Sequence, residues 1–357
     1  MIFSYGDNNN MKNTKTIKTI LFVSLIAAMI LPFSGMNFAE AKQVDDKSLV
    51  KEKIKDKMNK QADKDKKEKD SNTKYTSDEY GIPYNLIFEE NGKLVVGIDA
   101  EKTKEFGKQY SKDDVKIDLD TTMDLDVRYY VFDREASLRA GDGMVHPDRL
   151  TESLATITVV KSGKIVTTGH AYALNESVAA GMYGTTTACQ EVKITKDSNY
   201  SGAYADAAYG IDMNNNSSCN NSFINDSLRY NGNTYSVTYG TASDITLNKF
   251  IRMVGMKSGA TSGYILDVDV TAKFGNDVLN DQVVGNYASQ GGDSGAPIFS
   301  ITGSSSVKLL GQHVGKACEV DLNSGTNFAQ WCSNPQTGEG ALTIFSPWDQ
   351  VATHLGI

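Results

Sequence analysis

The sequence predicts an all-β protein, built as antiparallel β-barrels or as a sandwich, with a C-terminal helix and a small α/β unit before it. Three features of the chain favour this fold. From about residue 137, short segments rich in β-branched residues alternate with Gly, Ser, Asn and Asp, as in antiparallel strands joined by turns. These segments are ATITVV, KIVTTG, SVTYG, YILDVDVTAKF and KLLGQHVG. One helix, PWDQVATHLGI, closes the chain, and residues 137–357 can bury the cores of two barrels.

The first 41 residues have the composition of a secretory signal peptide. Lys12, Lys15 and Lys18 form a positive region, an apolar stretch covers residues 20–32, and Ala39-Glu40-Ala41 matches an A-x-A cleavage site. We therefore expect cleavage after Ala41 and a mature protein that is secreted and extracellular. An uncleaved membrane anchor is the alternative. It is disfavoured because the apolar stretch is shorter than the roughly 18 to 20 residues of a membrane span.

Residues 42–79 are dominated by Lys, Asp and Glu. Only Leu49, Ile54 and Met58 could form a thin apolar stripe along a helix. Charge runs of this kind are usually solvated. The segment is therefore predicted to be a charged linker or solvated helix that contributes no core.

Residues 80–136 have the pattern of a small α/β unit. YNLIFEENGKLVVGID predicts two strands around an Asn91-Gly92 hairpin turn, AEKTKEFGKQY a short helix, and VKIDLD a further strand. The acidic run DLDTTMDLD lacks the spacing and the Gly of a calcium loop, so it is interpreted as solvated charge. A unit of this size is too slight for an enzyme but suits a pro-region.

The net charge and the cysteine content limit which partners, metals and cofactors are expected. The net charge of -8 argues against nucleic acid as the main partner, because phosphate binding needs a basic face. Four cysteines in an exported chain are compatible with two disulfides, for which Cys189–Cys219 and Cys318–Cys332 are the pairs nearest in sequence. Four buried thiols are the alternative. The cysteine spacing does not fit a zinc site, and no metal or organic cofactor is expected. We expect a monomer with no membrane span after signal removal.

The stretch GGDSGAPIFS, residues 291–300, has the features of a nucleophile loop. Glycines before Ser294 allow the backbone to bend until successive N–H groups point into one small space. The apolar run after it enters a core strand. A reactive serine surrounded by such donors can attack a carbonyl and stabilise the resulting oxyanion.

A base and an acid for this serine can be sought upstream. The chain has four histidines, His146, His170, His313 and His354. His170 directly follows the predicted strand KIVTTG, which would hold its imidazole rigidly at a barrel edge. Among the acids, Asp206 is followed by Ala207 and Ala208, small neighbours that let a carboxylate lie behind an imidazole. Asp212 is the second choice, and Asp197 is also near enough.

The order His170, Asp206, Ser294 in an exported all-β chain resembles that of the chymotrypsin-like serine proteases. In detail the chain resembles their bacterial branch, the streptogrisins and α-lytic protease. The similar segments, in order, are LRAGDGM, VTTGHAYAL, DAA, MKSGATSGYILDV, GGDSGAP and IFSPWDQVATHLGI, and they extend over about residues 137–357.

The resemblance implies two antiparallel six-stranded β-barrels with a C-terminal helix over this range. It also implies a division of roles. Ser294 would attack the peptide carbonyl, His170 would move the proton, and Asp206 would orient His170 in the catalytic triad. The N–H groups of Gly292 and Ser294 would form the oxyanion hole, and Asp293 would be structural, by pairing with a new N-terminus or by anchoring the loop. The relatives carry pro-regions that assist folding and are then removed, a role that residues 42–136 would fill.

Two departures from the family are visible. Ala171 stands where relatives usually carry a disulfide cysteine. Ala296 replaces a common glycine, as a small residue also does in some glutamyl-specific relatives. Neither position takes part in the chemistry directly.

The resemblance also indicates which residues line the substrate pocket. Its walls would be residues 287–290 and 311–317, and Ala288 stands near the aspartate of trypsin-like enzymes, so cleavage after Arg or Lys is not expected. His313 and Ser289 stand where glutamyl endopeptidases bind a substrate carboxylate, and Lys316 could add charge at the rim. The expected substrate-binding residues are thus Ser289, His313, Gly315 and Lys316. A preference for Glu or Asp is one hypothesis, and an apolar pocket with His313 packed in its strand is the other.

The expected activity is that of a serine endopeptidase, a hydrolase acting on protein or peptide substrates, made as a zymogen whose own pro-region is a partner. A catalytically inactive surface binding module with a protease fold is the rival hypothesis, since fold alone does not fix function. All three triad residues are present, which favours the enzyme.

Overall fold

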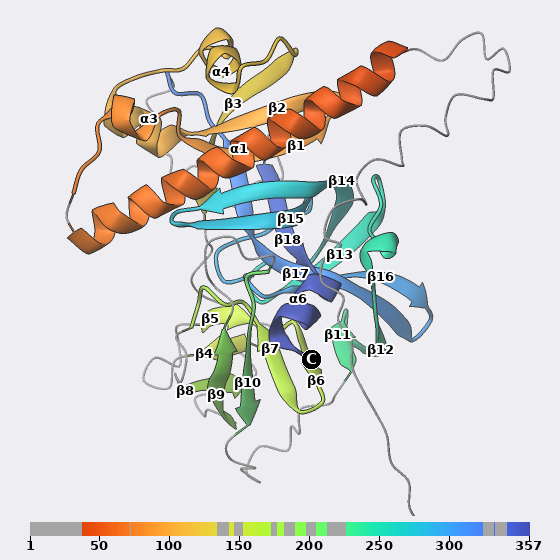
Figure 1. The fold of residues 1–357 in the computed structure, drawn as a ribbon. Coiled ribbons are helices and arrows are strands. Elements are labelled where there is room, and N and C mark those ends of the chain that lie inside the picture. The colour runs from red at the N-terminus through yellow and green to blue at the C-terminus, as the bar shows by residue number, and fades with distance from the viewer. Residues whose placement is uncertain are drawn as a thin grey trace, which may run out of the picture. The chain divides into compact units, whose positions relative to one another are not determined.

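A computed structural model describes residues 38–71, 73–133, 143–145, 153–172, 177–181, 190–197, 205–212, 226–323, 332 and 341–357. Residues 46–357 form one compact unit, which is mainly β-strand with a C-terminal helix, as predicted (Figure 1). The helices are α1 (Phe38–Ser71), α2 (Ser77–Tyr80), α3 (Ala100–Phe106), α4 (Lys112–Leu119) and α6 (Trp348–Leu355), with a 3-10 turn at Ala242–Asp244.

The strands belong to two sheets. One contains β1 (Tyr84–Glu90), β2 (Lys93–Asp99), β3 (Leu125–Asp133), β11 (Ser227–Tyr230), β12 (Asn233–Tyr239), β13 (Phe250–Gly255), β14 (Gly259–Phe274), β15 (Asp277–Gly285), β16 (Pro297–Gly303), β17 (Ser306–Glu319) and β18 (Ala341–Pro347). The other contains β4 (Gly143–Val145), β5 (Ser153–Thr156), β6 (Val159–Lys161), β7 (Lys164–Thr167), β8 (Ser177–Gly181), β9 (Gln190–Asp197) and β10 (Ala208–Asp212).

The predicted hairpin and the helix after it are both present in the N-terminal α/β unit. β1 and β2 pair antiparallel around Asn91 and Gly92, whose φ angles of 51° and 78° are those of a two-residue hairpin turn. α3 follows at once, and the Asp99 side chain caps it by accepting hydrogen bonds from the N–H groups of Glu101 and Lys102.

The prediction of a strand at VKIDLD is wrong, because this segment forms most of helix α4. Ser111 caps the helix, and the carboxylate of Asp114, three residues later, accepts a hydrogen bond from the Ser111 N–H. Val115 and Leu119 are buried one turn apart, whereas Ile117 is 79% exposed. The alternation of apolar and charged residues imitates a strand, but the capping box and the four-residue spacing decide the structure.

The prediction that residues 42–79 contribute no core is also wrong. α1 lies along the β1–β2 hairpin (Figure 1), and it buries a stripe of side chains spaced four residues apart. The stripe consists of Val50, Ile54, Met58 and Ala62, which pack with residues of β1, β2, β3 and α4. Leu49, which was expected in the stripe, is 57% exposed.

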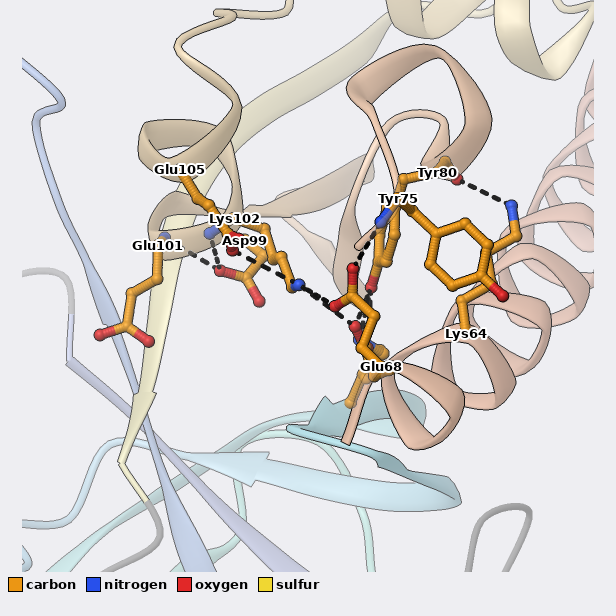
Figure 2. Close-up of polar contacts among 10 residues, drawn as sticks. Lys64, Glu68, Tyr75, Tyr80, Asp99, Glu101, Lys102 and Glu105 are labelled. Carbon is orange, nitrogen blue, oxygen red and sulfur yellow. Dashed lines mark hydrogen bonds and ion pairs between the residues drawn. The ribbon is translucent and has the colours of Figure 1, made fainter. Parts of the chain in front are cut away.

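A cluster of polar side chains connects the C-terminal part of α1 to neighbouring elements (Figure 2). Lys102 of α3 forms an ion pair with Glu68 of α1 at 2.7 Å. The Tyr80 hydroxyl donates to the Asp65 carboxylate at 2.7 Å, and Lys273 of β14 pairs with the same carboxylate. Asp65 and Lys273 are both buried, so each charge depends on the other for compensation.

Six strands of the larger sheet form a closed circuit of antiparallel pairs, which matches the six-stranded barrel expected at the C-terminal end. The circuit runs β13–β14–β15–β18–β17–β16 and returns to β13. Its interior is an apolar cluster that includes Ile251, Ile265, Ile298 and Phe345. The start of β17 also takes β12 alongside it in parallel.

The N-terminal strands are part of the same sheet. β1 pairs with β14, and β3 pairs antiparallel with β17 from Tyr130–Glu319 to Asp133–Lys316. Leu86, Phe88 and Tyr130 of the N-terminal unit pack with Val270 and Phe274 in one buried cluster. The α/β unit and the barrel therefore share a core.

The smaller sheet follows the strand order β5-β4-β8-β9-β10-β7-β6. The segment ATITVV, predicted as one strand, is split into β5 and β6 by Ile157 and Thr158. Because β5 and β6 lie at opposite ends of the sheet, this single bent segment links the two ends. If β5 and β6 are counted as one interrupted strand, the described part of this sheet has six strands.

Some of the remaining predictions concern residues that the structure describes, and others do not. Cys318 and Cys332 form the expected disulfide, whereas Cys189 and Cys219 lie outside the described residues. So do His146 and residues 1–37 of the predicted signal peptide. Among the described helices, none has both the length and the apolar character needed to cross a membrane.

We predict that Ile54→Ala lowers the free energy of unfolding by about 2–5 kcal/mol, because it empties a fully buried site in the α1 interface. Leu49→Ala, five residues earlier on the same helix, is the control and should change it by no more than about 0.5 kcal/mol. Urea denaturation monitored by circular dichroism measures both. Equal losses in the two variants would contradict the packing of α1.

We also predict a pH-dependent contribution from Glu68. Burial alone would raise its pKa, but hydrogen bonds from Lys102 and the Tyr75 N–H hold the pKa below its usual value. The ionised form is thus favoured by folding, so the stabilisation is present above the ordinary pKa of about 4.3 and is lost as the pH falls through the lower folded value. Glu68→Gln should lower Tm at pH 7, and its difference from wild type should disappear near pH 3.

Thermal unfolding at pH 7, 5 and 3 tests this prediction. Glu52→Gln is the control, since its side chain is 71% exposed and 4.0 Å from its Lys55 partner. A Glu68→Gln difference that persists at pH 3 would mean that Glu68 acts through packing and not through its charge.

Candidate active site

The turn that carries Ser294 is buried and depends on its glycines. Gly292 and Gly295 have φ angles of 104° and 85°, which side-chain-bearing residues rarely adopt. A Cβ atom on Gly295 would lie 2.3 Å from the Thr156 carbonyl oxygen and 2.9 Å from Thr167 Oγ1. Gly295 is therefore required by both conformation and space, and it lets the serine turn approach the smaller sheet.

Two threonines of the bent β5–β6 segment hold this turn. The Thr156 N–H donates to the Ser294 carbonyl at 2.8 Å, and Thr156 Oγ1 donates to the Gly292 carbonyl at 3.0 Å. Thr158 Oγ1 lies 2.6 Å from the Gly295 carbonyl. Thr156, the last residue of β5, and Thr158, one of the two residues between β5 and β6, thus both contact the serine turn.

Asp206 is fully buried and its carboxylate receives four hydrogen bonds from one short segment. Oδ1 accepts from the N–H groups of Gly169 and His170 at 3.1 and 2.8 Å, and Oδ2 accepts from Thr168 Oγ1 at 3.1 Å. Oδ2 also bonds to Nδ1 of His170. Because an ionised carboxylate can only accept, Nδ1 of His170 carries the proton of this contact, and Nε2 is the ring nitrogen that does not face Asp206.

Gln312 and Ser346 join this pair to the barrel. Gln312 of β17 donates through Nε2 to the Asp206 carbonyl at 2.7 Å, while its Oε1 accepts from Thr158 Oγ1 at 2.8 Å. The Asp206 N–H lies 3.4 Å from Ser346 Oγ. One side chain, Gln312, therefore spans from the aspartate to the threonine that holds the serine turn.

Direct contacts among the described residues join two members of the predicted triad, His170 and Asp206. The His170–Asp206 pair is formed, and the His170 side chain is 4% exposed. His170 Nε2 makes no hydrogen bond within the described residues, and Ser294 Oγ donates to the Val314 carbonyl at 3.3 Å. Catalytic hydrogen bonds are often long or misaligned before substrate binds. Asp197 and Asp212, the other acids considered, end β9 and β10.

Asp293, expected to be structural, anchors the loop. Its buried carboxylate accepts from the N–H groups of Lys257 at 2.8 Å, Ser258 at 3.0 Å and Gln290 at 2.7 Å. A Cβ on Gly255 would lie 2.3 Å from its Oδ1, so glycine is needed there as well. Of the two roles expected for Asp293, the described contacts support loop anchoring.

The four expected substrate-binding residues lie on one strand and one facing segment. His313, Gly315 and Lys316 belong to β17, where the register against β18 shifts between His313 and Gly315. One extra residue reverses the alternation, so His313 and Lys316, three apart, turn to the same face. Lys316 Nζ lies 3.4 Å from the Ser289 carbonyl. Lys316 is 2% exposed and is thus buried, not at the rim as expected.

Ser289 has a distinctive hydroxyl. Its side chain is 1% exposed, and its Oγ has no hydrogen-bond partner within the described residues. A buried hydroxyl left without a partner costs roughly 1–3 kcal/mol, so a ligand that supplies one is favoured. Ser289, His313 and Lys316 are all buried, and the Lys316 amine lies beside the Ser289 carbonyl.

Sequence reasoning missed the residues that connect the site. Thr156 and Thr158 were counted only as strand residues, although their two-residue spacing already placed both hydroxyls on one face. Gln312 and Tyr287 lay in the segments expected to form the pocket walls, but neither was singled out. No local signal marks Gln312, because its partners Asp206 and Thr158 are more than 100 positions away in the chain.

No protein-family model matches the sequence, and no curated protein does. Solved structures similar in fold include a chymotrypsin from Cellulomonas bogoriensis (15% identity, 60% of this chain and 94% of that one, TM-score 0.42). Protease A of Thermobifida fusca is similar at 16% identity, over 61% of this chain and 96% of that one, with a TM-score of 0.42. A glutamic-acid-specific serine protease described as using a histidine triad in substrate binding is 21% identical over 60% and 95%, with a TM-score of 0.41.

We predict that Gly295→Ala destabilises the protein by about 1–2 kcal/mol for the left-handed backbone and a further 1–3 kcal/mol for the displaced Thr156 carbonyl. Gly163→Ala is the matched control, because its φ is +74° but a Cβ there meets open space. Urea unfolding of both variants in a Ser294→Ala background measures this without self-digestion. A Gly163→Ala loss as large as that of Gly295→Ala would contradict the close approach of the two sheets.

Proposed function

We propose that this protein is a serine endopeptidase that hydrolyses peptide bonds through an acyl-enzyme. The observation that carries the proposal is the His170–Asp206 pair, oriented so that Nε2 is the base, and fixed to the Ser294 turn through Gln312 and Thr158. A buried carboxylate that orients an imidazole next to a glycine-flanked serine is an arrangement suited to nucleophilic catalysis.

In the proposed mechanism Ser294 Oγ attacks the carbonyl carbon of the scissile peptide bond, and His170 Nε2 takes the hydroxyl proton. The tetrahedral oxyanion is held by the N–H groups of Gly292 and Ser294, each worth roughly 2.7–4 kcal/mol in the transition state. The C–N bond then breaks as His170 returns the proton to the leaving amine. Water repeats these steps on the acyl-enzyme. Asp206 remains ionised and stabilises the imidazolium.

The specificity proposed is for an acidic residue before the scissile bond. Lys316 would supply a buried positive charge, Ser289 a buried hydroxyl and His313 an imidazole. All three belong to the segments proposed as the pocket walls, residues 287–290 and β17. A substrate carboxylate would provide these groups with a charged acceptor that an apolar side chain cannot provide. A protease with an apolar pocket is the second candidate.

The export of the chain, and a pro-enzyme in which residues 42–136 are the pro-region, belong to the same proposal. They are supported by the signal-like segment before Ala41 and by the compact α/β unit before the barrels. The functional alternative is a binding module that has the protease fold but no activity.

Ser294→Ala should lower kcat/KM on peptides by roughly 10⁶-fold, because attack and proton transfer act as one unit. It should also abolish labelling by a fluorophosphonate probe and any self-processing seen by intact mass. Peptides with Glu, Phe or Arg before the scissile bond measure specificity, and Glu is expected to be preferred. Preference for Phe would replace the acidic pocket by the apolar one, and identical behaviour of both proteins would leave the binding module.

A further inference from the structure

A buried tyrosine is in direct contact with the imidazole of the proposed pocket. The Tyr287 hydroxyl lies 2.8 Å from Nδ1 of His313, and the two rings meet edge to face with centroids 5.5 Å apart. Tyr287 is 2% exposed and His313 is fully buried. The contact is thus shielded from bulk water. A hydrogen bond in such a buried environment is stronger than one at the surface.

His313 is fixed at its backbone as well as at its ring. Its N–H donates to the Ala296 carbonyl at 2.9 Å, and its carbonyl accepts from the Gly295 N–H at 2.8 Å. Both partners directly follow Ser294 in the nucleophile turn. The position of the imidazole relative to Ser294 is therefore set by the backbone, and the remaining freedom is ring rotation and the location of the ring proton.

Tyr287 is itself held in place by two close glycines. A Cβ on Gly285 would lie 3.1 Å from the Tyr287 ring, and one on Gly263 would lie 2.6 Å from the Tyr287 N–H nitrogen. The ring also packs in the barrel core with Val283 and Ala296. The hydroxyl cannot easily move away from Nδ1.

We propose that Tyr287 is a positioning residue for substrate specificity, which holds His313 in the form that presents an N–H to an acidic substrate side chain. This inference rests on the proposed endopeptidase function. A Tyr287 hydroxyl that donates to Nδ1 makes Nδ1 an acceptor, and neutral imidazole then carries its proton on Nε2. Nε2–H can donate to a substrate carboxylate without the imidazole having to be charged.

Loss of the hydroxyl has a consequence that depends on pH. In Tyr287→Phe the neutral ring can place its proton on Nδ1, and that tautomer turns a lone pair toward the carboxylate. Only the imidazolium then guarantees a donor at Nε2. The ionisable groups nearby are Tyr287 on the facing segment, Lys316 on the same strand and Asp293 in the serine turn, while the partner on β18 is the non-ionisable Phe345.

The test compares wild type, Tyr287→Phe, His313→Leu and Tyr264→Phe as full-length chains, with peptides that differ only in Glu or Gln before the scissile bond. The readout is the Glu:Gln ratio of kcat/KM from pH 8 to pH 5.5, in which effects on His170 cancel. Tyr264 is a half-exposed tyrosine of β14 and serves as the control for removal of a hydroxyl.

We expect Tyr287→Phe to lower the Glu:Gln ratio at pH 8 by roughly three- to tenfold, because the neutral ring can then turn a lone pair toward the substrate carboxylate. Wild type and Tyr264→Phe should keep a high ratio at pH 8, and His313→Leu should have a low ratio at every pH. A merely structural role for Tyr287 would change all substrates alike at every pH.

The outcomes separate this inference from the proposed function. A Tyr287→Phe ratio equal to that of wild type at pH 8, with His313→Leu still low, overturns the role of Tyr287 and keeps the acidic pocket. A high ratio in His313→Leu overturns the acidic pocket itself. Absence of Ser294-dependent hydrolysis of any peptide overturns the endopeptidase.

Discussion

The buried carboxylate of Asp206 is the group on which the geometry of the candidate site depends. A charge fully removed from water is tolerated only when it is well hydrogen-bonded, and Asp206 obtains its four donors from residues 168–170. Those bonds fold the chain after β7 into a turn around the carboxylate. The same requirement therefore fixes both the backbone of His170 and the tautomer of its ring.

The contacts around Asp206 extend to the second sheet because its own backbone is held from there. Gln312 and Ser346 come from β17 and β18, and Gln312 also reaches Thr158, which holds the serine turn. Neither sheet alone contains a complete site. Serine, histidine and aspartate reach their relative positions only when the smaller sheet and the barrel are packed together, which links the geometry of the candidate site to the integrity of the whole unit.

Much of the fold could be predicted from local pattern, since strands bounded by turn residues and the Asn91-Gly92 hairpin carry their signal in adjacent residues. His170, Asp206 and Ser294 could be selected because motif residues surround each of them. The errors share a physical cause. VKIDLD has alternating apolar residues, but the helix cap at Ser111 makes the segment helical. The helix α1 has few apolar residues, yet their four-residue spacing is enough to build a core. Gln312 and Tyr287 could not be selected, because their importance lies in partners that the sheet topology supplies.

The sharing of a sheet between the α/β unit and the barrel has a consequence for the order in which the chain is made. β1 and β3 are synthesised before β14 and β17, the later strands they pair with, and Glu89 meets Asp267, which follows 178 positions later. Pairings this distant in sequence are slow to form from an open chain. An α/β unit that has already folded with α1 offers the edges of β1 and β3 as a template. The later strands β14 and β17 can add to that template one at a time, so early synthesis becomes a kinetic advantage for a topology that is otherwise slow to assemble.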